Sequence, residues 1–123
     1  MKYYVCKHCG NIIKYVKNSK VPVVCCGEKM SELIPGSQDG AYEKHVPKIK
    51  IDGNKVTVLV GSVEHPMIEA HYIQWIEIET KKGSQKINLS PADKPIAEFI
   101  LTSDDEFICA YEYCNLHGLW RSN

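Results

Sequence analysis

Residues 48–60, KIKIDGNKVTVLV, decide the fold. Residues 48–52 alternate charged and apolar side chains, which is typical of a β-strand with one buried face. The Asp52-Gly53-Asn54 sequence that follows is a turn signal, and residues 56–60 form a second β-prone run. Together they predict an antiparallel β-hairpin.

More short β-prone runs separated by turn signals follow this hairpin, and no sustained helical period appears. With the hairpin, the predicted strands are Lys48–Ile51, Val56–Val60, Ile73–Ile78, Gln85–Leu89, Ala97–Leu101 and Glu106–Tyr113. The third of these runs alternates less regularly and predicts a bulge. Short strands at close spacing favour an antiparallel β-sandwich or barrel.

The sequence before the hairpin predicts a separate small unit. Residues 1–34 hold four of the six cysteines and have too few apolar side chains for a core, so the unit needs a metal to stabilise it. Residues 35–42 include Pro35-Gly36-Ser37-Gln38-Asp39-Gly40, a turn-rich stretch that we interpret as a linker. Residues 43–123 are the predicted β domain.

Composition excludes several classes of protein. The chain of 123 residues has 15 basic and 15 acidic residues and no net charge, which argues against nucleic-acid binding. No stretch has the roughly 20 apolar residues of a membrane helix. The N-terminus has no apolar signal core, so we expect a cytoplasmic protein in which cysteines bind metals and do not form disulfides.

The first metal-binding pattern is Cys6-x-x-Cys9 followed by the adjacent pair Cys25-Cys26. Four thiolates suit tetrahedral iron or zinc. Adjacent cysteines point in different directions in an extended chain, so both can bind one ion only with local distortion. From the spacing alone, a structural zinc site and an electron-transferring iron site are equally good interpretations, and a thiol–disulfide motif is less favoured. His8 is expected to be a surface residue.

The second pattern combines histidines and one cysteine near Pro and Gly, in three turn-like segments. These segments contain His45, then His65 and His71, then Cys114-x-x-His117. Imidazoles with one thiolate suit iron, copper or zinc. Five ligands are too many for ordinary zinc and leave one octahedral position of iron open, which an enzyme that reduces a small oxygen species would need.

The motifs EKHVP, HPMIEAHYIQWIE and EYCNLHGLW, with CxxC and CC upstream, resemble the desulfoferrodoxin family of superoxide reductases. The resemblance covers nearly the whole chain. It implies a desulforedoxin-like four-cysteine iron domain and a seven-stranded immunoglobulin-like sandwich. It also implies a second, catalytic iron with His45, His65, His71 and His117 as equatorial ligands and Cys114 as the axial ligand.

The resemblance assigns roles to two charged residues and implies the reaction. Glu43 can occupy the sixth position of the ferric site, and Lys44 lies beside the open position, where it would attract superoxide. The iron would reduce superoxide by one electron to hydrogen peroxide, and an external donor such as rubredoxin would restore the ferrous state. Without the family match, Glu43 and Lys44 would be a solvated charged turn. The resemblance also implies a homodimer.

Four further residues are expected to have structural roles, and two other functions are possible. Cys109 lies in an apolar run five residues before Cys114, and we expect a buried side chain that is neither a ligand nor a disulfide partner. Tyr72, Trp75 and Trp120 are expected to pack around the ligands. The alternative functions are a non-enzymatic iron electron carrier and a zinc-stabilised binding module.

Overall fold

The computed structural model describes all 123 residues and divides them into two compact units, Met1–Ile34 and Pro35–Asn123. The longest helix has four residues, so no helix is long and apolar enough to cross a membrane.

The first unit is built of very short strands around a metal-binding corner. A three-stranded sheet has the order β2-β1-β5, and a separate hairpin joins β3 to β4. These strands are β1 (Tyr3–Val5), β2 (Ile12–Ile13), β3 (Val24–Cys25), β4 (Glu28–Lys29) and β5 (Ser31–Leu33). Tyr3 and Cys6 are the only buried residues of this unit. The unit therefore has almost no apolar core, as its composition predicted.

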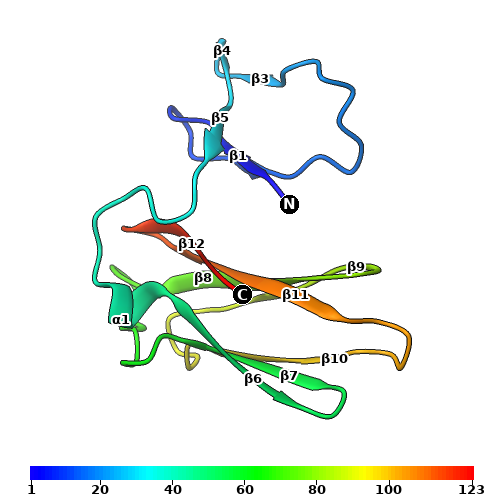
Figure 1. Cartoon of the computed structure of the whole chain (residues 1–123). Coiled ribbons are helices and arrows are strands. Elements are labelled where there is room, and N and C mark those ends of the chain that lie inside the picture. Colours follow the sequence, from blue (N-terminus) through cyan, green and yellow to red (C-terminus); the bar gives the residue numbers. More distant parts are fainter. The chain divides into compact units, whose positions relative to one another are not determined.

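The second unit is an antiparallel β-sandwich of seven strands preceded by one helical turn (Figure 1). The elements are α1 (Tyr42–His45), β6 (Pro47–Asp52), β7 (Lys55–Val60), β8 (Ile73–Thr80), β9 (Gly83–Asn88), β10 (Ile96–Ile100), β11 (Phe107–Cys114) and β12 (Gly118–Ser122). One sheet has the order β10-β7-β6 and the other has the order β12-β11-β8-β9. The prediction of a mainly β chain with a small four-cysteine unit and an antiparallel sandwich is confirmed.

The core lies between the two sheets. On β7 the side chains alternate, and Val56, Val58 and Val60 are buried. From the facing sheet, Ile76 and Ile78 of β8 pack into the same cluster. The β6–β7 hairpin pairs Asp52 with Lys55 around Gly53-Asn54, as the sequence predicted.

Two local features shape the end of the sandwich that carries the histidines. The register between β11 and β8 shifts between Tyr113 and Cys114, so the predicted irregularity of β8 is a β-bulge near Ile73. The helical turn α1 and the strand β12 were not predicted. The helical turn has only four residues, too few for a helical period, and β12 does not alternate because Gly118, Leu119 and Trp120 are all buried.

Candidate metal centres

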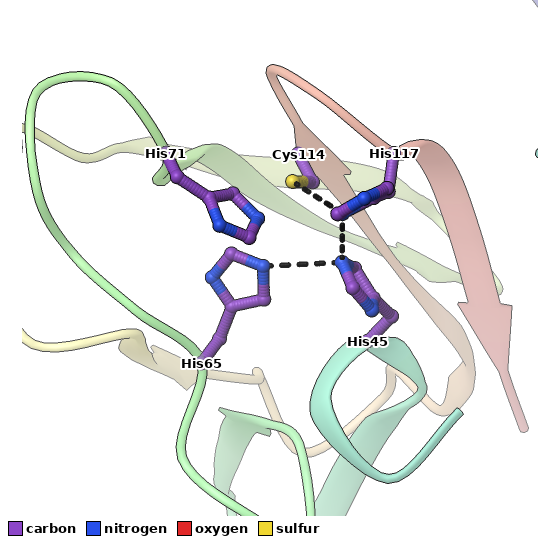
Figure 2. Close-up of side chains that lie close together, drawn as sticks. All are labelled: His45, His65, His71, Cys114 and His117. Atoms are coloured by element: carbon purple, nitrogen blue, oxygen red, sulfur yellow. Dashed lines mark hydrogen bonds between the residues drawn. The ribbon is translucent and has the colours of Figure 1, made fainter. Parts of the chain in front are cut away.

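Five side chains from three segments converge at one end of the sandwich (Figure 2). Each offers one nitrogen or sulfur atom, and all five atoms lie within 4.8 Å of one another. The five residues are His45, His65, His71, Cys114 and His117. The structure thus brings together all the residues of the second pattern in the sequence.

His45 is positioned by the helical turn and by an aromatic side chain. It is the last residue of α1, and its Nδ1 lies 2.8 Å from the Ala41 carbonyl oxygen. Since a carbonyl only accepts, Nδ1 carries the proton and Nε2 presents a lone pair to the cluster. The Trp120 indole stacks on the imidazole, with ring centroids 5.0 Å apart, and its Nε1 donates to the His117 carbonyl at 3.0 Å.

The loop of residues 61–72 supplies His65 and His71. The Nδ1 of His65 donates to the Pro66 carbonyl at 2.7 Å, so its Nε2 also presents a lone pair. His71 exchanges two backbone hydrogen bonds with Ile68, of 2.9 and 3.1 Å, which close a tight turn and fix the position of the His71 ring. His65 and His71 therefore come from one loop, between β7 and β8.

The β11–β12 hairpin supplies the remaining two side chains of the cluster. Cys114 pairs with Gly118 across a three-residue loop that contains His117. Gly118 has φ +76°, a left-handed conformation that favours glycine at this point of a short hairpin. The His117 Nδ1 lies 3.8 Å from the Cys114 Sγ and 3.0 Å from the His45 Nε2. His117 therefore faces the cluster with Nδ1, whereas His45 and His65 face it with Nε2.

Two nitrogen atoms of the cluster face each other without a proton between them. The Nε2 atoms of His45 and His65 lie 3.1 Å apart, and both are lone-pair acceptors because their Nδ1 atoms donate elsewhere. The His71 Nε2 is buried and has no hydrogen-bond partner. Buried polar atoms are normally satisfied, so these lone pairs fit a cation bound between them.

Burial favours the metal-binding form of the histidines. It lowers the pKa of His65 to about 4, and it lowers the pKa values of His45 and His71 as well. All three rings are thus neutral at neutral pH, as metal ligation requires. Burial raises the pKa of the Cys114 thiol, and a bound metal ion would reverse this by deprotonating the thiol. Four imidazoles and one thiolate fit iron, and the open position follows from the count of five ligands.

The two charged residues before His45 lie in α1 at the edge of the cluster. The Glu43 and Lys44 side chains are both exposed. Burial is the main cause of the lowered pKa values of His45 and His71, and the positive charge of Lys44 lowers them further. The Glu43 carboxylate does not belong to the five-residue cluster. The Glu43 carbonyl accepts a hydrogen bond from the Val63 backbone and so links α1 to the loop that carries His65.

Sequence reasoning missed three residues that shape the site. Asn115 accepts from the Tyr72 backbone at 2.9 Å and donates to the Ala70 carbonyl at 3.0 Å, which holds the loop of His71 against the hairpin. A side chain at Gly40 would come within 3.2 Å of both His45 and His117. The asparagine within Cys114-x-x-His117 was the one available signal, since asparagine is a frequent turn residue.

The third missed residue is Glu112, which lies on β11 two residues before Cys114. It is fully buried, and neither carboxylate oxygen has a hydrogen-bond partner. Burial raises the pKa of this carboxyl well above its usual value, so the protonated form is favoured. Residues 109–112 of β11 are buried consecutively and not in alternation, so no pattern in the sequence marked Glu112 as a buried carboxyl.

The four cysteines of the first unit also come together, with their sulfur atoms within 4.8 Å of one another. The Cys6 and Cys9 pair lies in a tight turn in which the Gly10 backbone donates to the Cys6 carbonyl at 2.9 Å. Cys26 has φ +53°, an unusual conformation for a residue with a side chain. This left-handed residue is the local distortion that allows adjacent Cys25 and Cys26 to face one point.

The thiols of this first cluster have strongly different affinities for protons. The Cys9 backbone N–H donates to the Cys6 Sγ and lowers the pKa of Cys6 to about 6. The neighbouring thiols raise the pKa of Cys26 to about 12. Four thiols around one point cannot all ionise without a cation, which is the electrostatic signature of a tetrahedral metal site.

The remaining histidine and cysteine lie outside both clusters. His8 is exposed, and its Nε2 lies 2.6 Å from a Glu28 carboxylate oxygen. Cys109 is fully buried and free, and its Sγ lies 3.6 Å from the Glu79 carboxylate on the neighbouring strand β8. Cys109 therefore contacts Glu79 and does not contribute to the histidine cluster.

Known proteins match both the sequence and the structure. The family model described as Desulfoferrodoxin matches residues 37–123. A desulfoferrodoxin of Nitratidesulfovibrio vulgaris is 48% identical over 119 residues, which are 97% of this chain and 93% of that protein. A desulfoferrodoxin homolog of Archaeoglobus fulgidus is 47% identical over 122 residues, 99% of this chain and 96% of that protein.

The structural match has the same extent. The crystal structure of the superoxide reductase from Treponema pallidum has a TM-score of 0.81 and 36% identity, and it covers 98% of both chains. Both metal-binding patterns, the sandwich fold and the near full-length identity therefore agree. The chain belongs to the desulfoferrodoxin family.

Proposed function

We propose that this protein is a superoxide reductase that converts superoxide to hydrogen peroxide at its histidine-rich site. The observation that carries the proposal is the pair of Nε2 lone pairs of His45 and His65, which lie 3.1 Å apart in a buried cluster with a thiol. The names of the relatives support it, since they include desulfoferrodoxins and superoxide reductases.

The ligand set would be His45, His65, His71, His117 and Cys114. Iron bound there would supply the transferred electron and one open coordination position. The backbone carbonyls of Ala41 and Pro66 hold His45 and His65 in the tautomer that binds metal. The Cys114 thiolate would donate electron density to the bound metal, as a thiolate ligand does in haem enzymes.

Charged residues at the edge of the cluster would handle the substrate. The Lys44 ammonium group attracts the superoxide anion, because a cation near a buried site raises the local concentration of anions. The Glu43 carboxylate lies on the same helical turn and would bind the open position of the oxidised metal. Both roles rest on the family motif and on the placement of α1.

The two units would have separate tasks. Residues 1–34 would form a desulforedoxin-like domain with iron bound by Cys6, Cys9, Cys25 and Cys26, residues 35–42 would connect it, and residues 43–123 would form the reductase domain. Four thiolate ligands leave no position for substrate, so the first iron would transfer electrons only. We also propose a cytoplasmic homodimer that accepts electrons from a small protein such as rubredoxin.

Reaction with pulsed superoxide tests the proposal. The iron-loaded, fully reduced protein is expected to be oxidised at the second site in a rapid bimolecular step that yields hydrogen peroxide and no dioxygen. The zinc-loaded protein is the control and is expected to be inert. Slow or absent reaction of the reduced iron protein would favour the second candidate, a non-enzymatic electron carrier.

A further inference from the structure

The charge of the chain is distributed unequally between its two units. The first unit has six lysines and two glutamates, a net charge of four positive, and the second unit has nine basic and thirteen acidic residues, a net charge of four negative. A ferric ion with four thiolates adds one negative charge to the first unit, and a ferrous ion adds two. The first unit therefore stays positive in both redox states.

The positive charges lie on the surface and the acidic groups are already paired. All six lysines of the first unit are exposed: Lys2, Lys7, Lys14, Lys17, Lys20 and Lys29. Glu28 lies 2.6 Å from His8, and Glu32 lies 3.8 Å from Lys2. The surface of the unit thus offers an excess of cations to any partner.

The thiolate cluster reaches the same surface. Cys9 and Cys26 are exposed, so two of the four sulfur atoms lie at the edge of the molecule. Lys7 stands between the first two cysteines in the chain, and Lys29 follows the Cys26 turn by three residues. Apolar Val24, immediately before the second cysteine pair, is 61% exposed. An apolar residue within a charged surface is typical of the small, transient interfaces of redox proteins.

The unit also has an open hollow suited to acidic side chains. Its volume is about 290 Å³, and its lining includes Lys2, Tyr4, Tyr15 and Lys20. The Lys2 ammonium group is already paired with Glu32, so the hollow presents the Lys20 ammonium group and two tyrosine hydroxyls to an incoming carboxylate.

We infer that the surface of the first unit is the docking site of an acidic protein that carries a one-electron centre. This inference rests on the proposed function, which needs an external electron donor. Docking would bring the donor to the exposed thiolates of Cys9 and Cys26. One electron would pass from the reduced donor to the ferric ion of the first unit, which becomes ferrous, and no proton or bond is transferred.

The test uses stopped-flow reduction of the first iron of the full-length, iron-loaded protein by an acidic rubredoxin. The charge-reversal variant is Lys7→Glu with Lys29→Glu. The matched control is Lys48→Glu with Lys50→Glu, two exposed lysines of β6 in the second unit. At about 10 mM salt, where charges act over about 30 Å, the first variant is expected to react about tenfold more slowly than wild type and the control less than about twofold more slowly.

Salt separates docking from a change in reduction potential. At about 1 M salt the screening length is about 3 Å, so the rates of all three proteins are expected to converge. A difference that persists there would show an altered potential and would overturn the inference, as would equal rates at low salt or an equally slow control. Tight binding of a labelled DNA duplex to the first unit, with unchanged donor kinetics in the charge-reversal variant, would assign the basic surface to nucleic acid and also overturn it.

The reaction with superoxide is measured separately on the pre-reduced proteins. If wild type fails to react with superoxide, the proposed function fails, whatever the donor kinetics show. If wild type reacts with superoxide but the donor rates do not depend on Lys7 and Lys29, only the docking inference fails.

Discussion

Asn115 and Tyr72 exchange hydrogen bonds across two segments that are 43 residues apart: the Tyr72 backbone donates to the Asn115 Oδ1 at 2.9 Å, and the Asn115 backbone donates to the Tyr72 carbonyl at 3.2 Å. Tyr72 directly follows His71, and Asn115 directly follows Cys114. The pair therefore fixes one histidine of the cluster relative to the cysteine. Residues that orient ligands in this way commonly change metal affinity when they are mutated.

Replacement of Asn115 by Ala is therefore expected to weaken metal binding at the second site about tenfold or more, because the side-chain bonds to Tyr72 and Ala70 are lost. Release of iron to a chelator, followed by visible absorbance, measures the effect. The matched control is Leu116→Ala, which removes an exposed side chain from the same loop. Equal release rates in both variants would show that the loop is held without Asn115.

Replacement of Cys114 by Ser is expected to abolish the thiolate-to-iron absorption band of the oxidised second site and most of the superoxide reduction. The reason is that the cluster contains a single sulfur atom. Cys109→Ala is the control, since Cys109 contacts Glu79 on the neighbouring strand, and it is expected to retain both properties. An iron-loaded Cys114→Ser protein with an unchanged spectrum would exclude the thiolate as a ligand.

Replacement of Lys44 by Ala is expected to slow the bimolecular reaction with superoxide about threefold at low salt while iron stays bound. The charge of Lys44 already affects the pKa values of His45 and His71, so the same charge should act on an approaching anion. Pulse radiolysis at several ionic strengths measures the rate, which is expected to fall with salt in wild type and less in the variant. Lys48→Ala, on the adjoining strand, should behave as wild type; equal rates and salt slopes for Lys44→Ala would contradict the prediction.

Acid is expected to destabilise the metal-free second unit between about pH 6.5 and pH 4. An unfolded histidine binds a proton below about pH 6.5, whereas burial lowers the pKa of His65 to about 4. Between these values the unfolded state binds more protons, so the stabilising effect of the neutral ring is fully present above the window and is lost as the pH falls. Urea unfolding followed by the fluorescence of Trp75 and Trp120 measures this loss.

His65→Gln is expected to reduce this dependence on pH. His8→Gln is the control, because Glu28 raises the pKa of the exposed His8 and its linkage has the opposite sign. An unchanged pH dependence in His65→Gln would show that other groups cause the loss of stability.

Replacement of Cys9 by Ser is expected to disturb the first metal site and leave the reaction of the pre-reduced second site with superoxide nearly unchanged. Four thiolates leave no open position for substrate, so the first site has no part in the chemical step. Visible spectra report the first site, and pulse radiolysis reports the second. A large fall in the superoxide rate with the second site fully loaded would show that the two units do not work separately.

Alternation and turn signals predicted six of the seven sandwich strands, because each such strand buries one face in the core. They did not predict β12, since its five residues follow a tight turn and its burial is decided by Leu119 and Trp120 packing in three dimensions. The members of both clusters were predicted from residue type and spacing together with the family motifs. Asn115, Gly40 and Glu112 were not, because their importance comes from contacts between segments far apart in the sequence.

The histidine cluster has a further consequence for the living cell. Its imidazoles are held in place by protein groups alone: backbone carbonyls, a stacked indole and a tight turn. Such a rigid nitrogen-rich cradle would also accept zinc or copper, and divalent affinities rise from iron toward copper for most protein sites. The identity of the bound metal would therefore be decided by which ions the cell makes available during synthesis. Excess zinc or copper would inactivate this protein by occupying the histidine cluster in place of iron, without unfolding it.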